Sequence, residues 1–225
     1  MVLSIIIPVV NESATINTVL TPLQALREKK LIEIIVVDGG SDDDTVEQSV
    51  LLADTVLSSP KGRSLQMNIG ADASTGDVLI FLHADTIVPE KYFSELKKIF
   101  NTKDNFWGFS SVELSGSHWF FRIIEKTINI RSRLTAVATG DQALFISRSL
   151  FFTVGRFPQI PLMEDVAISK LLRHIKRPCM LSSSVKTSSR RWEENGIFKT
   201  IALMWWLRAS YFFGVSPENL AKKYH

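Results

Sequence analysis

The sequence predicts an α/β fold in which helices flank a mostly parallel central sheet. Three apolar runs, residues 3–10, 32–38 and 77–83, are rich in β-branched side chains and have the length of strands that are buried on both faces. Segments with helical patterns separate them, and strands that alternate with helices form βαβ units with parallel strands. With 225 residues and 45% hydrophobic side chains, the chain can build one large domain with a sizeable core.

The other elements of the first half follow from local patterns. Residues 12–30 are predicted to be helical with an interruption at Pro22, because proline lacks the amide hydrogen that a helix interior needs. The stretch GGSDDDT after the second strand combines turn glycines with helix-capping residues. The elements expected around it are a helix over 45–52, a strand over 55–58, a loop and helix over 61–76 and a helix over 89–100.

The second half of the chain has a less regular pattern. The elements expected there are strands over 107–114, 142–148 and 179–186, and helices over 119–138, from near Glu164, and over 197–215. At about 100° per residue, the helix over 119–138 has one apolar and one polar, basic face. The apolar face carries Trp119, Phe120, Ile123, Ile130, Leu134 and Val137, and the polar face carries Arg122, Lys126, Asn129 and Arg133.

Charge is distributed unevenly between the two halves. Residues 1–115 have 9 basic and 16 acidic side chains, a net charge of −7, whereas residues 116–225 have 17 and 7, a net charge of +10. An acidic half suits a metal or sugar site and a basic half suits phosphates or an anionic lipid surface, although charge that only solubilises the protein is the alternative. One cysteine and a first segment unlike a signal peptide lead us to expect a cytoplasmic protein.

Common nucleotide and metal motifs are missing from the sequence. There is no G-x-x-x-x-G-K-[ST] loop, no G-x-G-x-x-G after the first strand and no H-E-x-x-H, and the four histidines have no metal-ligand spacing. These absences argue against a P-loop NTPase, a typical dinucleotide enzyme and a zinc protease. The basic residues are dispersed and match no nucleic-acid-binding motif, so we expect no nucleic-acid partner.

Carboxylates stand where predicted strands end. Asp38 and Asp85 each follow a buried strand, and Asn11 and Glu12 follow the first strand. In open α/β sheets, ligands bind beyond the carboxyl ends of the strands, so these side chains are expected at one edge. Asp85 could hold a divalent ion against a diphosphate, and Asp38 could accept hydrogen bonds from a nucleobase or ribose. Each could instead be a turn or cap residue.

Four stretches in order resemble the signatures of family 2 glycosyltransferases: SIIIPVVNE, IIVVDGGSDDDT, GRSLQMNIGADASTGDVLIFLHADT and PLMEDVAISKLLR. The stretches GDQALFISRSLF and SSRRWEENGIFKTIALMWWLRASYFFGVSP are similar to a short bacterial subgroup described as radical-SAM/selenodomain-associated. The resemblance implies an A-type glycosyltransferase fold, like that of nucleotide-diphospho-sugar transferases, in a single domain over 1–225. Residues 1–115 would bind the nucleotide sugar, and residues 116–225, with helical C-terminal elements, would bind the acceptor.

The resemblance also implies roles for particular residues. Asp165 matches the catalytic base, Asp38 the aspartate that contacts the nucleobase, and Asp85 the last aspartate of a D-x-D motif, which holds Mg²⁺ or Mn²⁺ and the diphosphate. Glu164, Arg191 and Trp192 fall in the acceptor or diphosphate region. The nucleotide-sugar set that it implies is Pro8, Val10, Glu12, Asp38, Gly39, Arg63, Ala84 and Asp85.

His83 departs from the pattern of that family, because many relatives have an aspartate at this position. The substitution puts metal dependence in doubt, and a histidine that packs at the end of a strand is the plainer interpretation. For Asp165, a role as a helix cap is the alternative that local sequence supports. As a base, it would take the proton of an acceptor hydroxyl while a metal and nearby cations stabilise the leaving diphosphate.

The aromatic segment over 197–215 is long enough to cross a bilayer but contains Arg208, which makes a spanning helix costly. Core packing and a helix lying in a membrane interface both fit, the latter bringing a lipid-linked acceptor to the site. We therefore expect an inverting glycosyltransferase that uses a nucleotide-diphosphate sugar, at the cytoplasmic face of a membrane or free of it. A non-catalytic nucleotide-sugar-binding or membrane-docking module, and a sugar-phosphate nucleotidyltransferase, are the alternatives.

Overall fold

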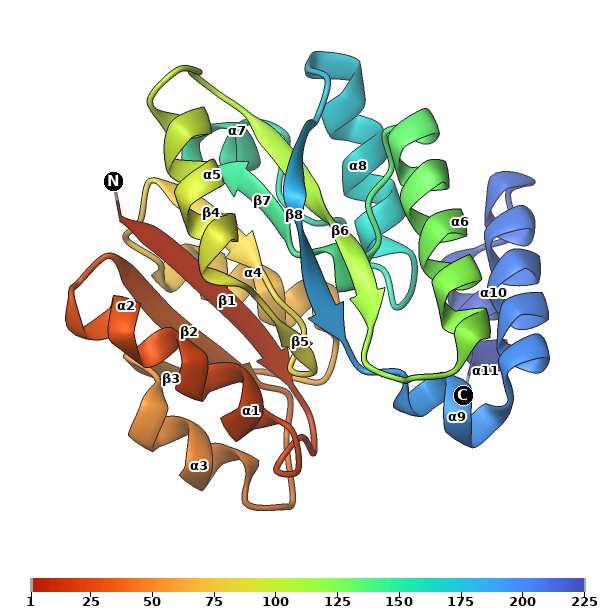
Figure 1. Ribbon diagram of the computed structural model, residues 1–225, viewed down its shortest axis with the longest axis horizontal. Coiled ribbons are helices and arrows are strands. Elements are labelled where there is room, and N and C mark those ends of the chain that lie inside the picture. Colours follow the sequence, from red (N-terminus) through yellow and green to blue (C-terminus); the bar gives the residue numbers. More distant parts are fainter. Residues whose placement is uncertain (1, 225) are drawn as a thin grey trace.

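The computed structural model describes residues 2–224, which form one eight-stranded sheet with helices on both faces (Figure 1). The strand order is β3-β2-β1-β4-β7-β6-β8-β5. The strands are β1 (Leu3–Val9), β2 (Ile32–Asp38), β3 (Thr55–Ser58), β4 (Val78–Phe81), β5 (Thr86–Ile87), β6 (Trp107–Leu114), β7 (Leu144–Ser147) and β8 (Cys179–Thr187). The predicted α/β class with a central sheet between helices is confirmed.

The first four strands of the sequence form the parallel part of the sheet. β1 lies between β2 and β4, with Ile5 opposite both Ile34 and Ile80. Side chains point alternately to the two faces, and both faces are buried: Ile5 belongs to one core cluster and Ile6 to the other. This double burial is the physical reason why these strands read as continuous apolar runs.

Helices from the first half cover both faces of this sheet. The predicted interruption at Pro22 is confirmed, because a 3-10 turn (η1, Thr21–Leu23) separates α1 (Ile16–Leu20) from α2 (Gln24–Glu28). Side chains of α1 and of α5 (Glu90–Phe100) belong to the cluster of Ile5. Side chains of α4 (Arg63–Ala73) pack in the cluster of Ile6 on the opposite face. The helix α3 (Thr45–Leu52) lies beside α1.

The second half extends the sheet with mixed strand directions. β7 is antiparallel to both β4 and β6, β8 is parallel to β6, and β5 is antiparallel to β8. The helices of this half are α6 (Trp119–Thr135), α7 (Arg148–Thr153), α8 (Glu164–Ile175), α9 (Arg190–Asn195), α10 (Ile197–Phe212) and α11 (Pro217–Tyr224), and a 3-10 turn, η2 (Gly140–Gln142), precedes β7. The sequence did not predict α7, α9, α11 or β5.

Two predicted helices end earlier than expected. α6 ends at Thr135, three residues before the predicted end, because Ala136 has a left-handed conformation with φ 53°. α10 ends at Phe212 instead of Val215, because the chain turns at Gly214, whose φ is 88°. No helix within residues 2–224 has the length and hydropathy needed to cross a bilayer.

α6 and α10 pack side by side at the far end of the molecule (Figure 1). The face of α6 that contacts β6 carries Phe121 and Ile124, which are buried. The apolar face predicted from the sequence is instead largely exposed, with Trp119 66% and Leu134 82% accessible. Core packing therefore accounts for only part of the apolar surface of this helix.

Candidate active site

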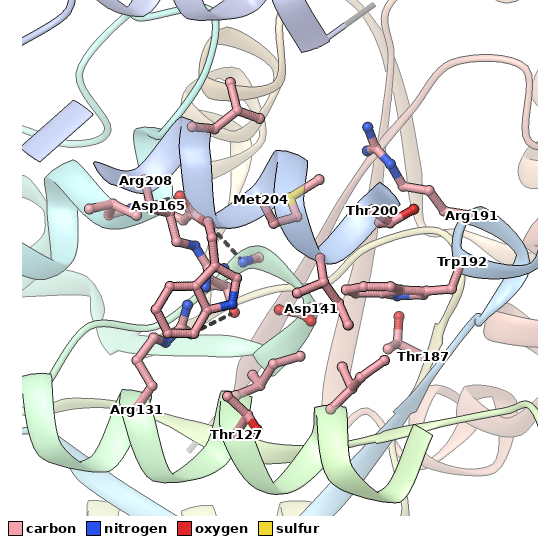
Figure 2. Close-up of a pocket in the computed structure, with 18 of the residues that line it drawn as sticks. Thr127, Arg131, Asp141, Asp165, Thr187, Arg191, Trp192, Thr200, Met204 and Arg208 are labelled. Carbon is pink, nitrogen blue, oxygen red and sulfur yellow. Dashed lines mark hydrogen bonds between the residues drawn. The ribbon is translucent and has the colours of Figure 1, made fainter. Parts of the chain in front are cut away.

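A cavity of about 810 Å³ opens between the end of the sheet, α6, α8 and α10. Figure 2 shows Thr127 and Arg131 reaching into it from α6, and Met204 and Arg208 from α10. His83 and Asp85 follow β4, and Thr187 ends β8. The cavity therefore lies at the edge where β4 and β8 end, which is where the direction of the strands places ligands in α/β sheets.

Asp165 lies in the first turn of α8, in the wall of this cavity. The backbone N–H of Gly140 donates to its Oδ2 over 2.8 Å, and the N–H of Val166 donates to its Oδ1 over 2.7 Å. Burial and the adjacent charge of Glu164 raise the pKa of Asp165 to about 6, against the lowering effects of the two hydrogen bonds and of Arg63. A fixed carboxylate whose pKa approaches neutrality suits a general base.

Glu164 and Arg63 form the ion pair next to Asp165. Nη1 of Arg63, at the start of α4, lies 3.4 Å from Oε1 of Glu164, whose side chain is almost fully buried. A buried carboxylate is stabilised by such a partner, since an unpaired charge there would be costly. The pair connects the first half of the chain to the first turn of α8. The expectation that Glu164 supports this turn stays a prediction.

Asp85 also lines the cavity and is positioned by two threonines. The hydroxyls of Thr86 and Thr187 donate to its Oδ1 over 3.2 and 3.3 Å. Within residues 2–224 no three His, Cys, Asp or Glu side chains gather into a metal cage. Mg²⁺ commonly binds through one or two carboxylates together with substrate phosphates and water, so a single carboxylate is compatible with a metal that arrives with its diphosphate.

His83 packs against the turn that carries the Gly140 amide. A Cβ atom on Gly140 would overlap the His83 imidazole, so the absence of a side chain at Gly140 allows this close packing. Burial, with a smaller contribution from Arg63, lowers the pKa of His83 to about 3. His83 is therefore neutral at ordinary pH and supplies no positive charge to a diphosphate.

Arg191 and Trp192 reach the same cavity from α9 (Figure 2). The guanidinium of Arg191 stacks on the ring of Tyr224 at 3.9 Å from its centroid and donates a hydrogen bond to the Tyr224 hydroxyl. This contact connects α9 to α11. Arg191 is thus one of the cationic groups that line the cavity, together with Arg63.

The structure places the remaining predicted site residues outside this cavity, along the ends of β1 and β2. The Asp38 carboxylate accepts hydrogen bonds from the backbone N–H groups of Gly40 and Ser41 and from the Ser41 hydroxyl. Glu12 is 3.7 Å from Arg190, which joins this edge to α9. Pro8, Val10 and Gly39 belong to the same edge, and Ala84 is buried between His83 and Asp85. Their nucleotide-binding roles stay predictions.

Three charged residues of the cavity were not predicted as site residues: Arg131, Asp141 and Arg208. Arg208 was noted in the sequence only because its charge makes a membrane-spanning helix costly. Arg131 and Asp141 interact electrostatically, and burial lowers the pKa of Arg131 and raises that of Asp141. Nε of Arg131 and Oδ1 of Asp141 are buried without a hydrogen-bond partner among residues 2–224. The polar turn TGDQ directly before a buried strand was the signal that could have located Asp141.

Comparisons with known proteins identify the family of this chain. A family model described as Glycosyl transferase family 2 matches residues 4–152. Glucosyl-3-phosphoglycerate synthase of Mycobacterium tuberculosis is 30% identical over 102 residues, which are 40% of this chain and 31% of that protein. The Mycolicibacterium smegmatis protein of the same name is 30% identical over 101 residues, 40% of this chain and 33% of that protein. The match thus spans about a third of the curated relatives' length.

Solved structures with the same fold include two glycosyltransferases. S. aureus TarS 1-349, also solved in complex with UDP-GlcNAc, has a TM-score of 0.66 and 16% identity. The structure of TarS 1-349 is matched over 84% of this chain and 61% of that chain. Glucosyl-3-phosphoglycerate synthase from Mycobacterium tuberculosis, in complex with Mg²⁺ and UDP, has a TM-score of 0.59 and 20% identity, over 83% of this chain and 69% of that chain. At these identities the likeness shows a shared fold, which confirms the predicted A-type glycosyltransferase architecture.

Proposed function

The chain belongs to glycosyl transferase family 2 and is a glycosyltransferase, and on this premise we propose that it is an inverting enzyme with Asp165 as its general base. The observation that carries this proposal is the Asp165 carboxylate, held by the Gly140 amide in the cavity wall with a pKa of about 6. The donor is a nucleoside-diphosphate sugar. Because TarS and the mycobacterial synthase were solved with UDP-GlcNAc and UDP, uridine diphosphate sugars are the first donors to test.

The proposed step is a single displacement. The acceptor oxygen forms a bond to the anomeric carbon while the bond from that carbon to the diphosphate oxygen breaks, and the nucleoside diphosphate leaves with the electron pair. Asp165 takes the hydroxyl proton, for which a distance of about 2.6–3.2 Å is required. Because attack occurs opposite the leaving group, the anomeric configuration inverts.

We propose that Asp85 holds Mg²⁺ or Mn²⁺ together with the donor diphosphate. When bound, the ion would neutralise negative charge that grows on the leaving group. The mycobacterial synthase was solved with Mg²⁺ and UDP and with Mn²⁺ and UDP, which supports this role. Arg63 and Arg191 lie in the same cavity and would supply additional positive charge from the protein.

We also propose that the chain belongs to the radical-SAM/selenodomain-associated subgroup and, separately, that its second half contacts a membrane interface, where a lipid-linked acceptor would reach the site. Phe198, Trp205, Trp206 and Phe212 are exposed along one side of α10, and Phe213 is exposed directly after its end. Exposed aromatic side chains on a helix with flanking cations are typical of helices that lie in an interface. We propose that this contact is made at the cytoplasmic face of a membrane.

The test of catalysis is Asp165→Asn, which keeps an acceptor for the Gly140 amide but removes the base. We expect release of nucleoside diphosphate from the donor to fall by at least about 100-fold while nucleotide affinity stays within about twofold. Asp104→Asn, at an exposed position, is the matched control and should keep full activity. Unchanged turnover in Asp165→Asn would overturn the proposal, and absence of turnover in every form, with nucleotide binding intact, would favour a binding module.

A further inference from the structure

We propose that the acceptor is an anionic amphiphile whose hydrocarbon chain lies between α6 and α10 while its headgroup reaches Asp165. The orientation of the headgroup rests on the proposed role of Asp165 as the base. The binding of the hydrocarbon chain rests on the walls of the cavity alone, so it can be tested without any turnover.

The walls of the cavity between the two helices are apolar. α6 contributes Phe120, Ile124 and Ile128, and α10 contributes Ile201 and Met204. These residues recur at helical spacing, so they form continuous strips that face each other across the cavity. Hydrophilic sugar acceptors do not match such walls, whereas an alkyl or isoprenoid chain would gain free energy from leaving water there.

The apolar walls continue onto the molecular surface. Trp205 lines the cavity and is also 65% exposed, so it stands at the mouth. Phe198 and Phe212 lie seven residues before and after Trp205, which places all three on one side of α10. Ile123 of α6 likewise lines the cavity and is 46% exposed. A chain that enters from a lipid surface would therefore meet apolar side chains along its whole path.

The polar end of the cavity carries a cation that the protein does not pair. Arg63 is paired with Glu164, and Arg131 faces Asp141 and Asp165. Arg208 projects into the cavity from α10 (Figure 2) and forms no ion pair with any residue among 2–224. An anionic headgroup, such as a phosphate, would form an ion pair with the Arg208 guanidinium while a hydroxyl group of the headgroup approaches Asp165. The net charge of +10 over residues 116–225 also favours an anionic ligand.

The experiment measures binding of soluble single-chain probes by tryptophan fluorescence and calorimetry, with no donor present. Dodecyl phosphate should bind saturably below its micelle concentration, at least about tenfold more tightly than dodecyl maltoside, and inorganic phosphate should not bind. Arg208→Gln should weaken dodecyl phosphate by about tenfold, as loss of a charge-assisted contact does. Lys199→Gln, on the opposite side of α10, is the matched control and should change nothing.

A second pair of variants tests the apolar walls. Met204→Glu places a charge inside the cavity and should abolish probe binding, whereas Leu51→Glu, at an exposed apolar position of α3, should leave it intact. Met204→Gln gives a milder change if the charged variant does not fold. Equal binding of the phosphate and maltoside probes, binding of inorganic phosphate alone, or binding unaffected at Met204 would overturn the inference.

Two other results are distinguishable. Self-association of the protein that occludes the cavity, seen as a concentration-dependent mass with no probe binding, would mean that a second copy covers this surface and would overturn the inference. If Asp165→Asn retains full turnover but dodecyl phosphate binds as expected, the proposed base is wrong while the apolar subsite stands. If the probe fails and nucleotide binding persists, the amphiphile inference alone falls.

Discussion

The two halves of the molecule differ in how completely they bury their apolar side chains and pair their charged groups. In the first half, the apolar side chains of β1, β2 and β4 are buried on both faces, and Asp38 has its hydrogen bonds supplied by its own turn. In the second half, Asp165 is a carboxylate that burial makes costly to ionise, Arg131 has a buried unpartnered nitrogen, and α10 exposes a row of aromatic side chains. We infer that the first half presents Asp85 and Arg63 from a fully packed frame, whereas the second half adds buried polar groups and exposed aromatic groups that residues 2–224 alone leave without partners.

The largest effect should separate buried from exposed isoleucines. Ile80→Ala, in the centre of β4, should lower the free energy of unfolding by about 2–5 kcal/mol, because the side chain is fully buried and its removal leaves a cavity. The matched Ile130→Ala removes a 56% exposed side chain from α6 and should change it by less than about 0.5 kcal/mol. Urea denaturation measures both. Similar losses in the two variants would contradict the comparison.

Asp165→Asn should make the protein more stable at pH 7.5, although it is expected to lose activity. The folded protein holds the Asp165 proton up to a pKa of about 6, against 3.8 for an unperturbed aspartate, so ionisation weakens the fold progressively as pH rises from 4 to 6. The variant removes this cost, which amounts to at most about 3 kcal/mol. Denaturation from pH 4 to pH 8 measures the difference between wild type and variant.

In that experiment the stability difference should be near its minimum at pH 4 and should reach a plateau above pH 6. Asp104→Asn provides the control, because Asp104 is exposed on the surface. A stability difference that does not depend on pH would show that Asp165 ionises as readily in the folded as in the unfolded chain. Ionisation of Asp165 would then not lower the stability of the folded protein.

The sequence predicted the first half well for the same reason that this half is stable. Strands buried on both faces must be apolar throughout, so β1, β2 and β4 were recognisable from composition alone. The helix interruption at Pro22 was also predictable from local sequence, as was, in the second half, the start of α8 at Glu164. Short helices such as α7 and α9 have one or two turns, which gives too few residues for a periodic signal, and their packing against the rest of the chain determines them.

The second half was less predictable because α6 has three kinds of surroundings. One side packs on β6, one lines the cavity and one is exposed. The sequence pattern distinguishes only an apolar and a polar face. Arg131 lies on the cavity side and could not be distinguished from a surface arginine. Asp165 was found through the family resemblance, since its sequence position alone is equally typical of a helix cap.

A smaller effect concerns the position of the Asp165 titration. Glu164→Gln should shift the carboxyl titration of Asp165 to lower pH, because the negative charge of Glu164 raises the pKa of Asp165. Arg63→Gln should shift it to higher pH, because the positive charge of Arg63 lowers that pKa. Nuclear magnetic resonance of carboxyl-labelled aspartate follows the titration without requiring turnover, with Asp165→Asn identifying the signal. Shifts of the same sign in the two variants would contradict the arrangement of these charges.

The smallest effect on stability is expected at the exposed end of α10. Phe213→Ser should change the free energy of unfolding by less than about 0.5 kcal/mol, since the side chain is 82% exposed and has little contact to lose. The same change should reduce sedimentation of the protein with vesicles that contain anionic phospholipid, because an exposed aromatic group gains most from an interface. Leu51→Ser, also strongly exposed but on α3, should leave vesicle binding unchanged. If both variants lose vesicle binding equally, exposed apolar area in general would explain the contact; if Phe213→Ser unfolds the protein, Phe213 itself belongs to the core and the division between the two halves is wrong.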